Sequence, residues 1–324
     1  MAILQALNLA VGFKQGNKHK VLLDDLNLKL EQGSMVALLG RNGAGKSTLL
    51  RALTCDTIPV NGTVEINGRL STSLTKRELS RLVALVATEH IMGGGFTVRE
   101  LVELGRQPHT GFLGRLSRYD IDVVDACLEA VGITDKAERH VADLSDGERQ
   151  KAMVAKALAQ HTPIIVLDEP TAFLDVASRI DTMKLLHKLA REQNKAVLLS
   201  SHDISQSLLL ADELWVITSD REVVTGTTEQ VVMSGVMDRV FGNSEILFNG
   251  SLCDYEAQLP STATVSIKCD DPLLERCMVN ALLRNGIAVD ESSDKVIVIK
   301  AVDSIVLPNG NKVTNVQEVL RLFQ

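Results

Sequence analysis

The phosphate-binding pattern G-x-x-x-x-G-K-[ST] is matched by Gly40-Arg-Asn-Gly-Ala-Gly45-Lys46-Ser47. The apolar run Met35-Val-Ala-Leu-Leu39 leads into these residues, and the helix-forming run Leu49-Leu-Arg-Ala-Leu53 follows them. This order predicts a strand, a glycine-rich turn and the start of a helix, which is the context that the pattern requires. Backbone N–H groups of such a turn converge on phosphate oxygens, and the helix N-terminus adds partial positive charge. The stretch therefore predicts a site for a nucleoside triphosphate.

Two side chains of this loop are expected to have separate roles. Lys46 should reach the outer phosphates, and the Ser47 hydroxyl should ligate Mg²⁺. The residues expected to contact the nucleotide are Arg41, Asn42, Gly43, Ala44, Gly45, Lys46, Ser47 and Thr48. The alternative is a glycine-rich turn that matches the pattern by chance, which the flanking strand and helix patterns disfavour.

Length and composition limit the classes of protein to consider. The chain has 324 residues, 45% apolar and 23% charged, which favours a soluble globular protein of two domains. Neither an apolar stretch of roughly 18 residues nor a signal peptide is recognised, so we expect a cytoplasmic protein. With a net charge of −7 no nucleic-acid partner is expected. The five cysteines form no C-x-x-C pair, which indicates free thiols.

Apolar patterning divides the chain into a larger α/β part and a smaller C-terminal part. Residues 4–30 alternate in polarity, which predicts antiparallel strands, and residues 97–159 are mainly helical. Strand patterns at 164–167 and 196–200 enclose a helix over 177–192, so we expect a parallel sheet covered by helices. The C-terminal part is predicted to contain a strand at 264–268, a helix at 271–284, a strand pair around 287–300, a strand at 305–307 and a helix at 316–323.

Two carboxylates follow one of the buried strands. Asp168 and Glu169 come directly after Ile164-Ile-Val-Leu167. Open α/β sheets bind ligands at the carboxyl ends of their strands, so both side chains should face the phosphate-binding loop. Asp168 is expected to hold Mg²⁺, directly or through water, and Glu169 to polarise the attacking water. The alternative is a pair of acidic residues that only solvates a strand end.

A capped helix precedes these carboxylates in the sequence. In Leu144-Ser145-Asp146-Gly147-Glu148, Ser145 takes the cap position and Glu148 follows three residues later, which predicts a capping box. The stretch also resembles the Leu-Ser-Gly-Gly-Gln signature of ATP-binding cassette (ABC) proteins, with Asp146 and Glu148 in place of Gly and Gln. The resemblance covers residues 1 to about 249. It implies that Ser145 and Gly147 close over the γ-phosphate bound by a partner subunit.

The resemblance implies roles for three further residues. His202 stands where the family carries its switch histidine, which contacts the γ-phosphate, although a lone histidine is usually structural. Asp175 lies in the segment that resembles the family's D-loop, which bridges the two sites of a dimer. Phe13 lies where the family places an aromatic ring beneath adenine, a contact that contributes roughly 1–3 kcal/mol. For Phe13 an ordinary core position is the alternative.

One position departs from the family pattern. The family places a glutamine after the strand that ends here at Val86, but this chain has Thr88 and Glu89, so one of these must supply any contact to Mg²⁺ or water. This variant, the Leu-Ser-Asp-Gly-Glu signature and the stretch Gly105-Arg-Gln-Pro-His109-Thr-Gly111 resemble importers of iron–siderophore, haem and cobalamin. His109 is expected to be a loop or contact residue because no second metal ligand has suitable spacing.

The resemblance implies the ATP-hydrolysing subunit of an ABC importer, with ATP and Mg²⁺ held between two copies arranged head to tail. Further partners would be transmembrane permease subunits and, indirectly, a periplasmic or lipoprotein substrate-binding protein. The subunit would lie peripherally on the cytoplasmic face of the inner (cell) membrane. The alternative is a soluble ABC ATPase that acts on ribosomes or nucleic acid. A GTPase is disfavoured because the chain lacks an Asn-Lys-x-Asp motif.

The expected fold is a P-loop NTPase of the ABC type, with a parallel sheet, an antiparallel β subdomain and a helical subdomain at about 89–160. The predicted domains are a nucleotide-binding domain at 1–249, a linker at 250–262 and a small α+β domain of unknown role at 263–324. Contacts to the cargo belong to the permease and the binding protein, so the cargo class rests on resemblance alone.

Overall fold

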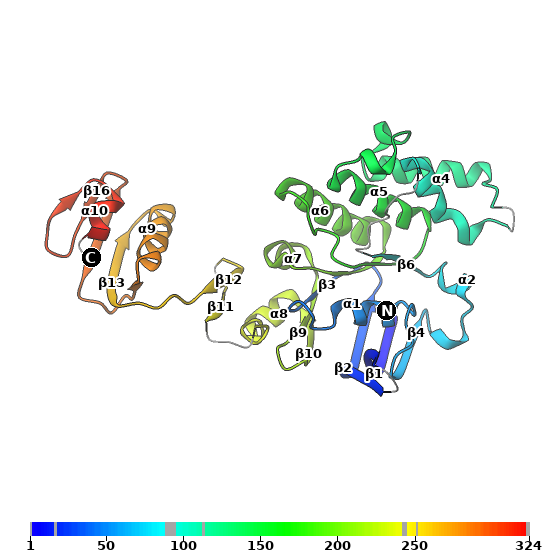
Figure 1. The fold of residues 1–324 in the computed structure, drawn as a ribbon, viewed down its shortest axis with the longest axis horizontal. Coiled ribbons are helices and arrows are strands. Elements are labelled where there is room, and N and C mark those ends of the chain that lie inside the picture. Colours follow the sequence, from blue (N-terminus) through cyan, green and yellow to red (C-terminus); the bar gives the residue numbers. More distant parts are fainter. Residues whose placement is uncertain are drawn as a thin grey trace. The chain divides into compact units, whose positions relative to one another are not determined.

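The computed structural model describes residues 2–15, 18–87, 95–111, 114–241, 245–250 and 252–321. The chain divides into two compact units, residues 1–243 with 248–254 and residues 244–247 with 255–324. Figure 1 labels the elements of each unit. Each unit has buried apolar clusters of its own, which give it an internal core.

A six-stranded sheet forms the centre of the first unit, in the order β10-β9-β3-β8-β7-β6. Its strands are β3 (Met35–Leu39), β6 (Val83–Val86), β7 (Ile164–Leu167), β8 (Ala196–Ser200), β9 (Glu213–Ile217) and β10 (Val223–Thr227). Neighbouring strands are parallel except β9 and β10, which are antiparallel. The four strands β3, β6, β7 and β8 are nearly continuous apolar runs because helices and a second sheet bury both of their faces.

A second, four-stranded sheet packs on one face of the central sheet and confirms the predicted antiparallel strands. It consists of β1 (Ala2–Gln15), β2 (Lys18–Glu31), β4 (Asn61–Ile66) and β5 (Arg69–Leu70). One apolar cluster joins this sheet to α1 (Lys46–Leu53) and to alternate residues of the central strands, among them Val166 and Leu198. The helix that follows the phosphate-binding loop is therefore anchored between two sheets.

Helices cover the opposite face of the central sheet. They include α3 (Val98–Glu103), α4 (Arg118–Ala130), α5 (Asp146–Ala159) and α6 (Val176–Gln193). Their apolar side chains pack with Leu167 and Leu199, which alternate along the strands with the residues of the other cluster. Successive strand residues point to opposite faces, so this alternation separates the two cores. The predicted α/β class, with parallel sheet, antiparallel sheet and helical layer, is confirmed.

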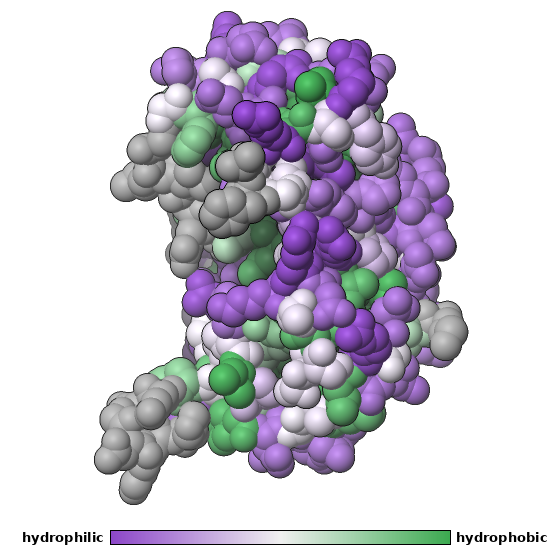
Figure 2. All heavy atoms as spheres, turned by 90° about the vertical axis from the view of Figure 1, so that its right-hand side faces the viewer, coloured by the Kyte–Doolittle hydropathy of each residue, from purple (hydrophilic) through white to green (hydrophobic). Residues whose placement is uncertain are grey.

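Shorter elements complete the first unit. The remaining α-helices are α2 (Lys76–Leu79), α7 (Ile204–Leu210) and α8 (Thr228–Met233). Short 3-10 helices span Ser71–Ser73, Leu104–His109, Thr134–Lys136, Val141–Asp143 and Val236–Arg239. On the face drawn in Figure 2, hydrophilic side chains predominate and hydrophobic ones form small separate groups. Across the described residues, no helix combines the length and the apolar character needed to span a bilayer.

The second unit contains a five-stranded sheet in the order β14-β13-β15-β16-β17. Its elements are β13 (Ala263–Cys269), α9 (Pro272–Arg284), β14 (Ile287–Val289), β15 (Val296–Ala301), β16 (Ser304–Val306), β17 (Lys312–Val313) and α10 (Val316–Arg321). The predicted pairing within residues 287–300 is wrong, because β14 and β15 both pair in parallel with β13, on opposite sides of it. In this order β13 has a neighbour on both sides, and Val265 near its centre is fully buried.

The stretch predicted as a linker contains regular structure. β11 (Ile246–Asn249) and β12 (Asp254–Ala257) form a two-stranded sheet, so part of the predicted linker 250–262 is a strand. Polar residues such as Asp254 and Glu256 concealed this strand in the sequence, and Glu256 forms an ion pair with Arg276 of α9.

Candidate active site

The phosphate-binding loop connects β3 to α1 and leaves the start of the helix open to a ligand. Gly45 takes the N-cap position with a φ of +112°, a left-handed conformation that glycine adopts without strain. Within the described part of the chain, no side chain caps α1. Its first N–H groups are therefore available to phosphate oxygens, as the sequence predicts. Exposed loop residues beside them are Arg41, Asn42, Gly43 and Ser47, with Ala44 and Thr48 half-buried.

Lys46 is buried beneath the loop and is held by backbone carbonyls. Its Nζ donates to the carbonyl oxygens of Gly40 at 2.8 Å and Arg41 at 3.3 Å. Burial lowers the pKa of the Lys46 ammonium, and the nearby carboxylates of Glu169 and Asp168 partly offset this effect. The loop thus holds a desolvated cation close to the two carboxylates, in a position to meet an anionic phosphate.

The two carboxylates of the Asp-Glu pair stand at the end of β7, beside the end of β8. Ser200, the last residue of β8, donates from Oγ to Asp168 Oδ1 at 2.6 Å and accepts from the Glu169 N–H at 2.8 Å. Glu169 itself has a φ of +51°, which is uncommon for a residue other than glycine. The sequence predicts both carboxylates but not Ser200, whose only signal in the sequence is its place at the end of a neighbouring strand.

The His202 side chain lies close to both Glu169 and the lysine of the loop. Its Nε2 lies 2.6 Å from Glu169 Oε1 and 3.4 Å from Lys46 Nζ. An ionised carboxylate only accepts hydrogen bonds, so Nε2 is assigned as the N–H that donates a hydrogen bond to Glu169, and its approach to the Lys46 ammonium is then a contact without a hydrogen bond. The three predicted residues Lys46, Glu169 and His202 are thus brought together by three different segments of the chain.

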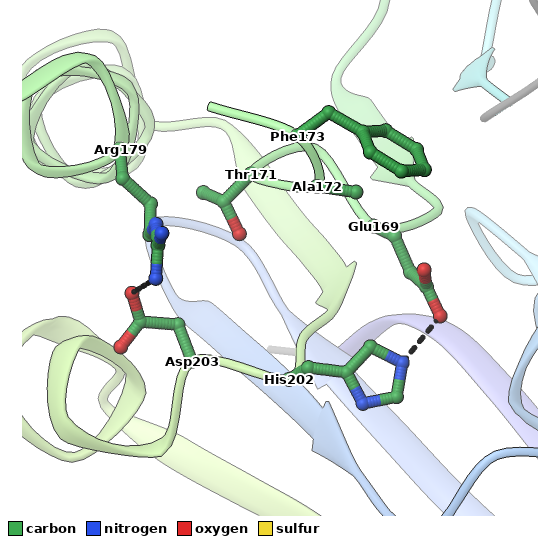
Figure 3. A pocket seen from close by; sticks show the side chains of 7 residues that line it. All are labelled: Glu169, Thr171, Ala172, Phe173, Arg179, His202 and Asp203. Atoms are coloured by element: carbon green, nitrogen blue, oxygen red, sulfur yellow. Dashed lines mark hydrogen bonds and ion pairs between the residues drawn. The ribbon is translucent and has the colours of Figure 1, made fainter. Parts of the chain in front are cut away.

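A pocket opens beside Glu169, and Figure 3 shows the side chains that line it. His202 and Glu169 point toward each other on one side, and Arg179 points toward Asp203 on the other. Arg179 Nη1 lies 3.5 Å from Asp203 Oδ2, and its Nη2 donates to the Leu174 carbonyl at 3.1 Å. The lining residues are Glu169, Thr171, Ala172, Phe173, Arg179, His202 and Asp203. Arg179 is likewise not predicted, because no local sequence pattern links it to Asp203.

The signature residues lie apart from the phosphate-binding loop of the same chain. Figure 1 shows α5, which Ser145 caps, beside α4 and at a distance from α1. Ser145 and Glu148 form the predicted capping box. Asp175 caps α6 by accepting from the Ser178 N–H at 2.8 Å, and this bond lowers the pKa of the carboxyl group. A methyl group at Gly147 would lie 2.8 Å from Ser178 Oγ, so the starts of α5 and α6 touch.

The structure bears differently on four other residues that the sequence analysis singled out. The Phe13 ring is 46% exposed, with Lys20 Nζ 5.7 Å from its centre, so its interpretation as a core residue is wrong and the ring is open to stacking. Thr88 and Glu89 lie outside the described residues. His109 Nε2 lies 2.8 Å from the Gln160 carbonyl oxygen, a contact typical of a structural loop residue.

A glycine-rich loop between a strand and a helix, with carboxylates at the end of a parallel strand, defines a P-loop nucleoside triphosphatase. Residues 23–172 match the family model described as ABC transporter. The chain is 34% identical over 242 residues to the ferric enterobactin transport ATP-binding protein FepC of Escherichia coli, covering 75% of this chain and 88% of FepC. The chain belongs to the ABC transporter family, as an ATP-binding subunit that hydrolyses ATP.

Another relative and a solved structure extend this comparison. The cobalamin import ATP-binding protein BtuD of Halobacterium salinarum is 38% identical over 220 residues, which cover 68% of this chain and 55% of that protein. The ATP-binding cassette MJ0796, solved as a dimer in a post-hydrolysis state with ADP and Pi, aligns with a TM-score of 0.62 and 27% identity. This alignment covers 69% of the present chain and 98% of the cassette.

Proposed function

We propose that this chain powers an importer of iron–siderophore, haem or cobalamin-type cargo. The observation that supports coupling to ATP hydrolysis is the bond of 2.6 Å between Glu169 and His202, next to Lys46. The cargo class is supported by the relatives FepC and BtuD, which are ATP-binding proteins of ferric enterobactin transport and of cobalamin import. The haem option follows only from the sequence resemblance.

In the proposed mechanism, the chain acts by positioning and by charge. Lys46 exchanges its carbonyl partners for the outer phosphates, and the open N–H groups of α1 bind phosphate oxygens. Glu169 accepts a proton from the attacking water, a role that contributes roughly 10²–10⁴ in rate. His202 donates to Glu169 and so orients its carboxylate toward that water. Groups that are already in place stabilise the developing charge without reorganising.

The donor set of the site fits Mg²⁺, which prefers hydroxyl and carboxylate oxygens. Ser47 and Asp168 would hold it, and Thr88 or Glu89 would add a contact. Ser47 is exposed at the start of α1, and Asp168 is oriented by Ser200 at the neighbouring strand end. When bound, Mg²⁺ would neutralise negative charge on the phosphates.

A second copy of the chain would complete each site. Ser145 and Gly147 lie on α5, apart from α1, so they suit the γ-phosphate held by the other copy of a head-to-tail dimer. Asp175 lies next to them, since Gly147 touches the Ser178 that Asp175 binds. The exposed Phe13 would stack on the adenine of its own loop. The dimer of MJ0796 supports this arrangement.

The subunit would bind permease subunits peripherally, on the cytoplasmic face of the inner (cell) membrane, and through them serve a periplasmic or lipoprotein binding protein. The relatives' roles in import favour this proposal over a soluble ABC ATPase acting on ribosomes or nucleic acid. We also propose that residues 1–249 form the nucleotide-binding domain and 263–324 a small separate domain. The division of the chain into two units supports this assignment.

Co-purification followed by an ATPase assay tests the proposal. The chain is expressed with the permease encoded beside its gene, and hydrolysis is measured in lipid with binding protein and ferric siderophore, haem or cobalamin. Stimulation by one cargo is expected. Recovery with ribosomes or nucleic acid, without membrane subunits, would contradict the importer assignment.

A further inference from the structure

Ser200 occupies a position that the sheet register places directly beside the catalytic carboxylates. Leu199 pairs with Leu167 in the ladder between β8 and β7, so the residues that follow them, Ser200 and Asp168, lie side by side. On the other side, Ser200 pairs with Leu38 of β3, two residues before the phosphate-binding loop. Its side chain is fully buried, with 0% exposure. A buried hydroxyl group therefore stands between the strand of the carboxylates and the strand of the loop.

The side-chain alternation aims this hydroxyl toward the nucleotide side of the sheet. Leu198 and Val166 contribute to the apolar cluster that contains α1. Ser200 and Asp168, two residues further along their strands, continue the same face. Helix α1 therefore packs on the same side of the sheet as the bond between Ser200 and Asp168.

The Ser200 hydroxyl makes one bond to each member of the Asp-Glu pair. It donates to Asp168 Oδ1 at 2.6 Å, which is short for a neutral donor and typical of a bond to a charged acceptor. It accepts from the Glu169 N–H at 2.8 Å. This second bond satisfies the amide of a residue held at a φ of +51°, a conformation that costs free energy outside glycine.

We propose that Ser200 is a positioning residue for ATP hydrolysis, whose hydroxyl orients the Asp168 carboxylate toward Mg²⁺ and holds Glu169 in its left-handed conformation. This inference rests on the proposed roles of Asp168 and Glu169. Partners that orient a metal ligand typically contribute 10–100-fold to metal affinity or activity. Ser200 therefore sets both the Mg²⁺ requirement and the rate, although it touches neither the nucleotide nor the water.

The substitution Ser200→Ala tests the proposal, because it removes the hydroxyl with little change in volume. Ser201→Ala is the matched control. Ser201 is equally buried, at 1% exposure, but its Oγ accepts from the Asp203 N–H at 2.9 Å, and in the described part of the chain this hydroxyl makes its hydrogen bonds to Asp203. The measurements are ATPase rate against Mg²⁺ concentration, binding of a fluorescent ATP analogue with Mg²⁺ or with EDTA, and thermal unfolding.

For Ser200→Ala we expect the Mg²⁺ concentration for half-maximal hydrolysis to rise about tenfold or more, with a lower kcat. Binding of the analogue should weaken with Mg²⁺ present but stay unchanged in EDTA. Ser201→Ala should keep the wild-type Mg²⁺ midpoint in both assays. The conservative variant Ser200→Thr retains a hydroxyl and should move the midpoint back toward the wild-type value.

Two results would overturn the role of Ser200. One is a folded Ser200→Ala protein with the wild-type Mg²⁺ midpoint and kcat. The other is an equal shift in Ser200→Ala and Ser201→Ala, which would indicate a general effect of losing a buried hydroxyl. Failure of the proposed function itself is distinguishable, since the wild-type protein would then show no Mg²⁺-dependent hydrolysis or analogue binding.

Discussion

Glu169 Oε1 and His202 Nε2 lie 2.6 Å apart, although 33 residues separate them in the sequence. The two side chains reach this distance because β7 and β8 are neighbours and end at the same edge of the sheet. The bond gives Glu169 a fixed orientation before water arrives. A base that is already oriented needs little reorganisation in the transition state.

Replacing Glu169 by glutamine should separate binding from hydrolysis. We expect Glu169→Gln to lower kcat by about 10²–10⁴, because the amide cannot accept the proton of the attacking water. ATP affinity should persist, and a stable dimer should form with ATP, visible by size-exclusion chromatography. Wild-type hydrolysis in this variant would remove Glu169 from the role of base.

Replacing Lys46 by alanine should weaken nucleotide binding rather than slow a later step. Hydrogen bonds to charged groups contribute about 1.5–3 kcal/mol, so we expect ATP affinity to fall about 10–100-fold in calorimetric titrations. Arg51→Ala is the control on the same helix, because it also removes a positive charge but at a half-exposed site paired with Asp56 at 3.8 Å. Equal losses in both variants would indicate a general effect of charge.

The capping box of α5 allows stability and activity to be separated. Ser145→Ala removes the acceptor of the Glu148 N–H and should cost about 1 kcal/mol of unfolding free energy. It should also lower hydrolysis, since Ser145 is proposed to contact the partner's γ-phosphate. Thr75→Ala removes the same kind of cap from α2, where Thr75 accepts from the Glu78 N–H. In denaturant unfolding, Thr75→Ala should lose about as much unfolding free energy as Ser145→Ala. Its rate of ATP hydrolysis should stay unchanged.

The pH dependence of stability should report the burial of Cys127 on α4. Burial raises the pKa of its thiol from 9.0 to about 11, so the folded state favours the neutral form. The stabilisation is complete below pH 9.0 and is lost as the pH rises toward 11, because only the unfolded chain releases the proton in that window. The slope is at most about 1.4 kcal/mol per pH unit.

Denaturant unfolding at pH 8 and pH 10 checks this expectation in the wild-type protein and in Cys127→Ala. Between pH 8 and pH 10, the unfolding free energy of the wild-type protein should fall by about 1 kcal/mol more than that of the variant. In the folded protein at pH 8, a thiol reagent should modify the exposed Cys277 and spare Cys127. Equal pH dependence in the two proteins would contradict the burial effect.

Local patterns in the sequence were sufficient to predict the fold class of the first unit and most residues of the candidate site. The loop around Lys46 and the pair Asp168 and Glu169 are read from contiguous residues whose chemistry depends on spacing alone. His202 follows a recognisable strand end. These features were predictable because the phosphate site is assembled from turns that directly follow buried strands.

Features that depend on contacts between distant segments could not be read from the sequence. Ser200 matters because β8 lies next to β7, and Arg179 because α6 approaches the start of α7. In the second unit, β14 and β15 pair in parallel with β13, on opposite sides of it, and not with each other. Sequence periodicity identifies strands but does not specify their neighbours.

The close approach of Gly147 to Ser178 brings the starts of α5 and α6 together. A side chain at position 147 would meet Ser178 Oγ at 2.8 Å, and Ser178 is bonded in turn to Asp175. Any residue larger than glycine at position 147 would therefore force Ser178 or the start of one of the two helices to move. A group that binds Ser145 from another molecule would therefore lie beside the segment that leads from Asp175 back to Glu169.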